Sequence, residues 1–128
     1  MNELAHPLFV SAGAVAGALS RFYVGFWLTE WLGGTYPIAT SVINFSGSFL
    51  IGGFAAFFKV HPHLPHGLWL FIGIGFLGGY TTFSTFGLDA YRLFERGDRP
   101  WGWLYSLSTV LSGILCCGIS YFLGCHFF

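Results

Sequence analysis

Charged residues are scarce in this sequence. Lysine, arginine, aspartate and glutamate make up 8% of the 128 residues, whereas soluble domains carry about 25%. The five basic residues balance the five acidic residues, and a nucleic-acid groove or a polybasic patch needs clustered positive charge. Nucleic acid is therefore not an expected partner. With 55% hydrophobic residues and a mean hydropathy of +0.69, the chain is expected to reside in membrane lipid.

Carboxylates and amides are almost absent from the apolar segments. Asp89 is the only carboxylate within them and Asn44 is the only amide. Proton-coupled carriers need an ionisable relay inside the membrane, so this scarcity argues against such a carrier. The apolar segments also contain no nucleophile with a nearby base and no cluster of metal ligands, so we do not expect an enzyme.

Four apolar windows are long enough to cross a bilayer, which takes about 20 residues in a helix. They cover residues 8–28, 37–58, 68–91 and 101–122. Tryptophans cluster at the ends of these windows, as in an interfacial aromatic belt. We therefore expect an all-α, multi-pass integral protein of the cell membrane, with a single domain over residues 1–128 and four transmembrane helices.

Basic residues differ little between the two sides of these windows. Lys59 lies on the side of the termini, and Arg92, Arg96 and Arg99 lie on the other. Taken literally, the positive-inside rule places the third loop in the cytoplasm. The bias is small, so the charge pattern permits insertion in both orientations.

Two windows carry a stripe of small polar residues spaced by three and four, which places them on one helical face. The second window contains Thr40, Ser41, Asn44, Gly47 and Ser48, and the fourth contains Tyr105, Ser108, Thr109 and Ser112. Polar groups in lipid are costly and usually face a partner helix or a water-filled path. Asn44 either joins two helices through a hydrogen bond or lines such a path, and the sequence leaves both open.

The first window offers a close helix contact and one embedded charge. Gly13 and Gly17 form a pair of small residues four apart, which is typical of tight helix packing in membranes. Arg21 lies well inside the same window. Its guanidinium either extends to the interface or meets backbone carbonyls.

The third window contains the stretch GFLGGYTTFSTFG, from Gly75 to Gly87. Gly78 and Gly79 weaken a helix, and the hydroxyls that follow compete for backbone hydrogen bonds. We therefore expect the third helix to be interrupted there. Freed carbonyls suit a cation, and a helix that begins again at Phe83 presents amide donors.

Phe83 and Phe86 are three residues apart and share a helical face. Aromatic ring edges are electropositive, so two edges beside an amide donor suit a weakly held anion. Two ordinary core phenylalanines are the alternative interpretation.

Three segments taken in order, GAVAGALSRF, VINFSGSFLIG and GFLGGYTTFSTFG, resemble the Fluc (CrcB) family of fluoride channels. The resemblance covers all four windows and agrees in order, spacing and length. It implies an antiparallel, dual-topology homodimer with two pores and a structural sodium ion at the dimer centre. Its implied partners are fluoride, membrane lipid and a second copy of the chain, with no organic cofactor.

The resemblance also implies roles for individual residues. The sodium ligands are the backbone carbonyls of Gly78 and Thr81, and Arg21 lies at the pore vestibule. The fluoride pore comprises Asn44, Phe83, Ser84, Thr85, Phe86, Tyr105, Thr109 and Ser112. On the fourth helix an ungapped match favours Thr109, Gly113 and Cys117, whereas the hydroxyl stripe favours Ser108 and Ser112; we take Thr109 and Ser112.

The function implied by the resemblance is passive, selective export of fluoride, which protects a cell from this ion. A small dimeric multidrug-type exporter is one alternative, but it needs an embedded acidic residue in the first window, where Arg21 is the only charged residue. A membrane subunit without transport activity is the other alternative. It leaves the two polar stripes and the interrupted third helix unexplained.

Overall fold

The computed structural model describes residues 5–128, almost all of them in helices. In chain order the elements are α1 (Ala5–Leu32), α2 (Ile38–Val60), α3 (His66–Leu68), the π-helical η1 (Trp69–Phe76), α4 (Leu77–Tyr80), α5 (Phe83–Glu95) and α6 (Arg99–Phe127). We call His66–Glu95 the third span, because α3, η1, α4 and α5 follow one another along it. The third span and the helices α1, α2 and α6 are each long and apolar enough to cross a membrane.

The helices extend beyond the windows expected from hydropathy, and glycines mark where two of them end. Gly33 and Gly34 follow α1 with φ of 87° and 65°, and Gly97 follows α5 with φ of 85°. These left-handed angles are readily adopted by glycine and stop a right-handed helix. Residues 1–4 of the expected single domain lie outside the described residues.

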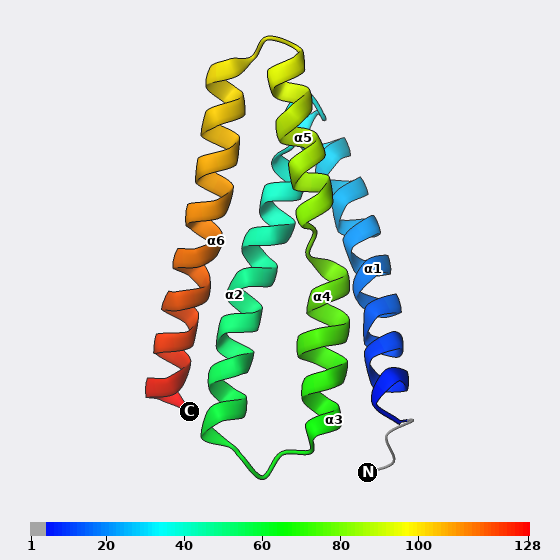
Figure 1. Cartoon of the computed structure of the whole chain (residues 1–128), viewed down its shortest axis with the longest axis vertical. Helices are drawn as coiled ribbons and strands as arrows, with labels where there is room; N and C mark the ends of the chain where they lie inside the picture. The colour runs from blue at the N-terminus through cyan, green and yellow to red at the C-terminus, as the bar shows by residue number, and fades with distance from the viewer. Residues whose placement is uncertain (1–4) are drawn as a thin grey trace.

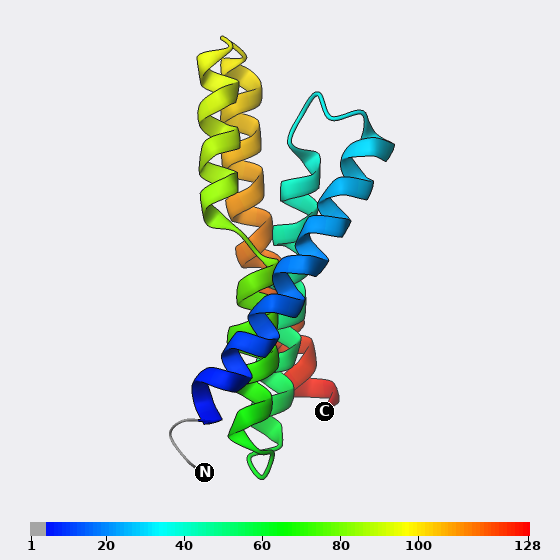
Figure 2. The same ribbon diagram turned by 90° about the vertical axis from the view of Figure 1, so that its right-hand side faces the viewer.

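The spans run alternately up and down, so that the start of α1 and the end of α6 lie at one end of the molecule with the α2–α3 connection (Figure 1). The α1–α2 and α5–α6 connections lie at the opposite end. Helix α2 packs most extensively against α6, and α1 packs against η1 and α4. We call the end with the α1–α2 and α5–α6 connections the loop end. Figure 2 shows that α5 and the adjoining half of α6 diverge from α1 and α2 toward this end.

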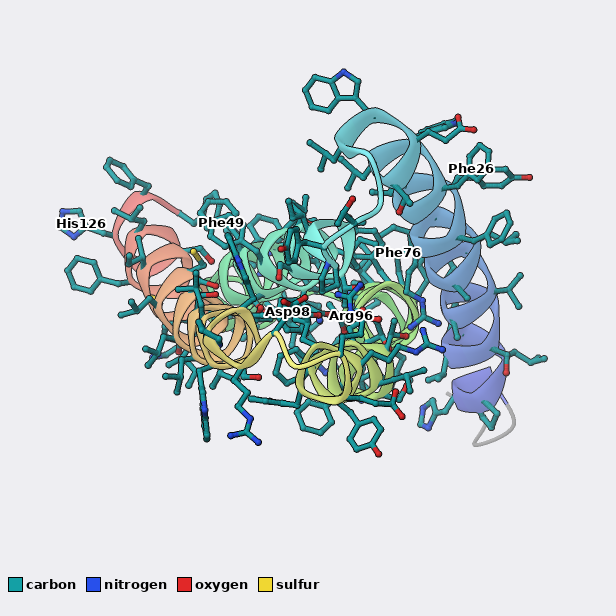
Figure 3. The ribbon with its side chains drawn as sticks, turned by 90° about the horizontal axis from the view of Figure 1, so that it is seen from above. Phe26, Phe49, Phe76, Arg96, Asp98 and His126 are labelled. Carbon is teal, nitrogen blue, oxygen red and sulfur yellow. The ribbon has the colours of Figure 1, made fainter. Side chains whose placement is uncertain are left out.

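The outer surface is strongly apolar. Viewed from above, the side chain of Phe26 points away from the bundle (Figure 3), and it is 51% exposed. Many other large apolar side chains on α1 and α6 are exposed in the same way. Such a surface suits contact with lipid and would be unfavourable in water.

Helix α1 meets the third span at close range through glycines on both sides. A Cβ atom on Gly13 or Gly17 would collide with backbone carbonyl oxygens of the third span. Gly75 and Gly79 of the third span also lie close to the backbone of α1, where a Cβ atom would collide. The predicted role of Gly13 and Gly17 in a tight helix contact is confirmed.

The third span changes direction at Thr81 and Thr82, which join α4 to α5. Both residues have extended backbone angles, with φ of −79° and ψ of 159° at Thr81 and φ of −151° and ψ of 120° at Thr82. The sequence predicted an interruption over the double glycine and the hydroxyl residues that follow it, but Gly78 and Gly79 lie inside α4 and only Thr81 and Thr82 are extended before α5 begins at Phe83. Gly79 is needed for the approach to α1 rather than for a break, since a Cβ atom there would press on the backbone of Ala14.

We expect Gly17→Ala to destabilise the fold, because the added methyl group would press on the carbonyl of Phe76. Overpacking of this kind costs about 1–3 kcal/mol. Gly118→Ala on α6 is the matched control, since a Cβ atom there meets nothing within 4 Å. Thermal unfolding in detergent measures both variants; equal midpoints would contradict this account of the α1 contact.

Candidate functional site

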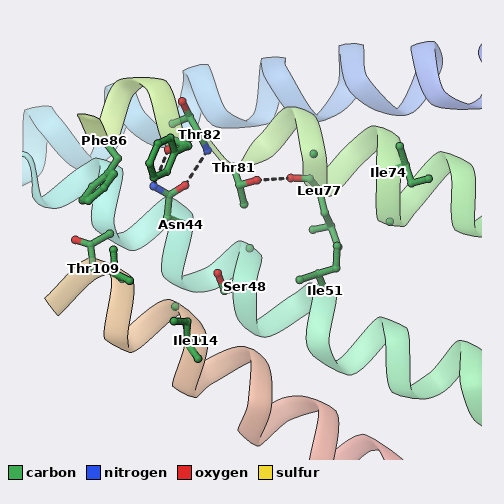
Figure 4. A pocket seen from close by; sticks show the side chains of 16 residues that line it. Asn44, Ser48, Ile51, Ile74, Leu77, Thr81, Thr82, Phe86, Thr109 and Ile114 are labelled. Carbon is green, nitrogen blue, oxygen red and sulfur yellow. Dashed lines mark hydrogen bonds between the residues drawn. The ribbon is translucent and has the colours of Figure 1, made fainter. Parts of the chain in front are cut away.

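An open groove of about 460 Å³ lies between α2, the third span and α6. We call it the central groove. Its walls come from residues 44–51 of α2, residues 73–86 of the third span and residues 109–114 of α6 (Figure 4). Of the predicted site residues, Asn44, Gly78, Thr81, Phe83, Phe86 and Thr109 line this groove.

Asn44 binds the backbone at the point where the third span bends. Its Nδ2 donates to the carbonyl oxygen of Thr82 at 2.8 Å, and its Oδ1 accepts from the Thr82 N–H at 2.8 Å (Figure 4). Backbone groups inside a bilayer must be satisfied within the protein, and this amide satisfies both groups of one extended residue. One N–H of the Asn44 amide remains, since a primary amide carries two donors.

Thr82 is a residue of this site that the sequence analysis did not single out. It precedes α5, and its Oγ1 accepts from the N–H of Thr85 at 3.2 Å, as a helix N-cap does. The same hydroxyl lies 3.0 Å from the Thr85 hydroxyl and 3.3 Å from the Ser84 hydroxyl. The sequence signal for this cap was a threonine just before the expected helix start at Phe83. Ser84 and Thr85 do not line the central groove.

Arg21 reaches the same bend from α1. Its Nη1 donates to the carbonyl oxygen of Thr81 at 3.0 Å. The sequence left open whether this guanidinium extends to the interface or meets backbone carbonyls. In the structure it meets a backbone carbonyl.

The carbonyl of Gly78 loses its usual helical partner. In a continuous α-helix it would accept from the N–H of Thr82, but that N–H donates to Asn44. Gly78 is also exposed, and a Cβ atom built on it meets nothing within 4 Å. Within residues 5–128 no group of three histidine, cysteine or acidic side chains lies close enough together to hold a metal ion.

The two phenylalanines differ sharply in burial. The ring of Phe83 is 80% exposed, whereas that of Phe86 is 8% exposed. Their centroids are 5.6 Å apart with a tilt of 48°, and Phe86 packs on the ring of Tyr105 at 5.4 Å. Tyr105 lies behind Phe86 and outside the groove lining; its buried hydroxyl has no hydrogen-bond partner in the described part of the chain.

The hydroxyls near the middle of α6 lie at two adjoining cavities, and Thr109 lines both of them. Thr109 faces the central groove, and its hydroxyl lies 2.8 Å from that of Ser41. Ser108 and Ser112 donate to carbonyls of their own helix and line a smaller pocket of about 170 Å³. Gly113 lines the central groove one turn beyond Thr109.

A second polar space lies at the loop end, which we call the loop-end cavity. It has a volume of about 550 Å³ and is lined by residues 29–40 and residues 85–96. The Thr40 hydroxyl donates to Asp89 at 2.8 Å and so links α2 to α5. Thr85 and Arg92 also line the cavity, whereas Arg21 does not.

Comparison with known proteins identifies the family. A family model described as CrcB-like protein, Camphor Resistance (CrcB), matches residues 8–123. The chain belongs to the CrcB family. This result confirms the resemblance noted in the sequence.

Several CrcB relatives carry the name fluoride-specific ion channel FluC. The protein of Nitrobacter winogradskyi is 46% identical over 114 residues, which cover 88% of this chain and 90% of the relative. The protein of a Methylobacterium species is 42% identical over 122 residues, or 95% and 98% of the two chains. The protein of a Synechococcus species is 38% identical over 109 residues, or 85% and 84%.

Membership of the CrcB family agrees with the four apolar helical spans. The protein is a multi-pass protein of the cell membrane. Its relatives are named as ion channels, so the prediction that it is not an enzyme is confirmed.

We expect Asn44→Ala to destabilise the bend, because it removes both side-chain bonds to Thr82. Leaving buried backbone groups unpaired costs about 1–3 kcal/mol. Unfolding in mixed micelles of mild detergent and sodium dodecyl sulfate measures the loss. Ser20→Ala is the control, since its hydroxyl donates only to the carbonyl of Ala16 in its own helix. If the two variants unfold alike, Asn44 does not hold the bend.

Proposed function

We propose that this protein is a fluoride-selective channel that lets fluoride leave the cell down its electrochemical gradient. The central groove carries the proposal, because Asn44, Thr109, Phe83 and Phe86 all line it. Relatives that are named fluoride-specific ion channels and align over most of the chain support it.

The chemistry of the groove suits a small, strongly hydrated anion. A selective pore must replace the water around such an ion with short-range donors. The free N–H of Asn44 and the hydroxyl of Thr109 supply donors, and the edges of Phe83 and Phe86 supply partial positive charge. Closed by a second copy of the chain, such a path would exclude the larger chloride ion by its width.

The other predicted pore residues extend this path. Ser84 and Thr85 lie at the start of α5, between the groove and the loop-end cavity, and Thr85 lines that cavity. Tyr105 supports the ring of Phe86, and Ser112 lines the adjoining pocket. We assign the loop-end cavity to the vestibule, with Arg21 placing positive charge at the bend beside it.

The open face of the groove supports a dimer. Phe83 is 80% exposed although it lies at the groove, and Gly78 faces open space. A second copy of the chain would complete the missing wall, and a two-fold arrangement would give two equivalent pores. The two sides of the membrane differ little in basic residues, with Lys59 on one side and the arginines at positions 92, 96 and 99 on the other. This weak bias permits insertion in both orientations and so supports antiparallel copies.

A sodium ion fits the bend of the third span, which we propose to be a functional interruption of that helix. The Gly78 carbonyl has lost its helical partner to Asn44, so its oxygen is available. The Thr81 carbonyl accepts from Arg21 and keeps a second lone pair. These oxygens from two copies of the chain would hold the ion, which would stabilise the dimer.

The alternatives explain less of the molecule. Within the predicted first window, α1 carries Arg21 and no acidic residue, so the relay of a proton-coupled exporter is absent from residues 8–28. A subunit without transport activity leaves the donors of the central groove without a role.

Fluoride efflux from liposomes that contain the purified protein tests the function. A fluoride electrode records the release under a potassium shunt, and chloride release is recorded in parallel. We expect fast fluoride release with negligible chloride release. Equal release of both anions, or no fluoride release from a demonstrably dimeric sample in sodium, would contradict the proposal.

We expect Phe83→Ile and Phe86→Ile each to slow fluoride efflux by about tenfold or more, which corresponds to about 1.4 kcal/mol on the barrier. Each change removes a ring edge and keeps an apolar side chain of similar size. Phe26→Ile is the matched control, because its ring points outward from α1. Size-exclusion chromatography verifies that each variant remains assembled. Unchanged efflux in either the Phe83 or the Phe86 variant would contradict the role assigned to the ring edges.

A further inference from the structure

The central groove contains one hydroxyl, that of Ser48, with no hydrogen-bond partner in the described part of the chain. Its polar side chains are Asn44, Ser48, Thr81, Thr82 and Thr109. Asn44 is bonded to Thr82, and the Thr81 hydroxyl donates to the carbonyl of Leu77. The hydroxyls of Thr109 and Ser41 are bonded to each other. The Thr82 hydroxyl caps α5. Within residues 5–128, Ser48 makes no side-chain hydrogen bond of any kind.

Ser48 lies on the same face of α2 as Asn44, because the two residues are four apart. One turn of helix separates them, or about 6 Å along the axis. Figure 4 shows Ser48 on the part of α2 that faces α6, further along the groove than Asn44.

The opposite wall presents no hydroxyl to the groove at this level. Thr109 faces the groove on α6, and four residues later the same helical face carries Gly113. A Cβ atom built on Gly113 would lie 3.4 Å from the Ser48 hydroxyl oxygen, which is an ordinary contact distance. The Ser48 hydroxyl therefore occupies the space in front of Gly113.

We propose that Ser48 donates its hydroxyl to the fluoride ion at a second position in the groove, one turn beyond Asn44 and Thr109. This inference rests on the proposed function and deepens it. Conduction of a strongly hydrated ion needs successive weak sites rather than one strong site. A hydroxyl with no partner in the protein can donate a hydrogen bond to a passing anion without breaking an existing hydrogen bond. On α6 the corresponding position is Gly113, so α2 supplies this donor.

Moving the hydroxyl from one wall to the other tests the inference. Ser48→Ala is expected to slow fluoride efflux from liposomes by about tenfold, the loss expected for one hydrogen bond to a charged group. The double variant Ser48→Ala with Gly113→Ser returns a hydroxyl to the same level from α6, and we expect it to recover most of the parent rate. The space in front of Gly113 accommodates this side chain, because its Cβ atom makes only an ordinary contact.

Ser106→Ala is the matched control, because that hydroxyl donates to the carbonyl of Gly102 in its own helix. It is expected to conduct like the parent. Thermal midpoints and elution volumes of all variants separate loss of conduction from loss of folding.

The outcomes distinguish failure of the Ser48 proposal from failure of the proposed channel function. If Ser48→Ala conducts like the parent, or if the double variant is folded but as slow as Ser48→Ala, the role of Ser48 is overturned while the channel function stands. If the parent itself releases no fluoride, both proposals are overturned.

Discussion

The bilayer leaves no water to satisfy the backbone at the bend of the third span, and the fold is organised around this constraint. Two residues with extended backbone interrupt the hydrogen-bond pattern between α4 and α5. Asn44 satisfies the N–H and carbonyl of Thr82, and Arg21 satisfies the carbonyl of Thr81. The amide from α2 and the guanidinium from α1 thus hold irregular backbone that lipid could not tolerate.

The same contacts determine what the central groove offers. Because the amide of Asn44 is held against Thr82, its remaining N–H has a defined direction rather than a range of rotamers. Capping of α5 by Thr82 fixes the first turn of that helix, and with it the positions of Phe83 and Phe86. A structural role and a pore role for Asn44 were alternatives in the sequence, but the two hydrogens of one amide allow both.

The sequence was most informative where one helix decides the outcome. Runs of apolar residues predicted the four spans, and the spacing of Gly13 and Gly17 predicted the close contact of α1. The sequence was least informative where distant segments meet. The bonds of Asn44 to Thr82 join residues 38 apart in the chain, so no local pattern could show that the two glycines stay helical and that only Thr81 and Thr82 are extended. The opposition of Ser48 and Gly113 depends in the same way on how α2 and α6 face each other.

The glycine contact between α1 and the third span also bears on how ions would be moved. Carriers that work by alternating access need one bundle of helices to rock against another, and that motion needs interfaces with room to slide. Here the two backbones touch at Gly13 and Gly17, and even one added carbon atom would collide. Such an interface behaves as a rigid frame. A frame of this kind does not favour the rocking motion that alternating access requires.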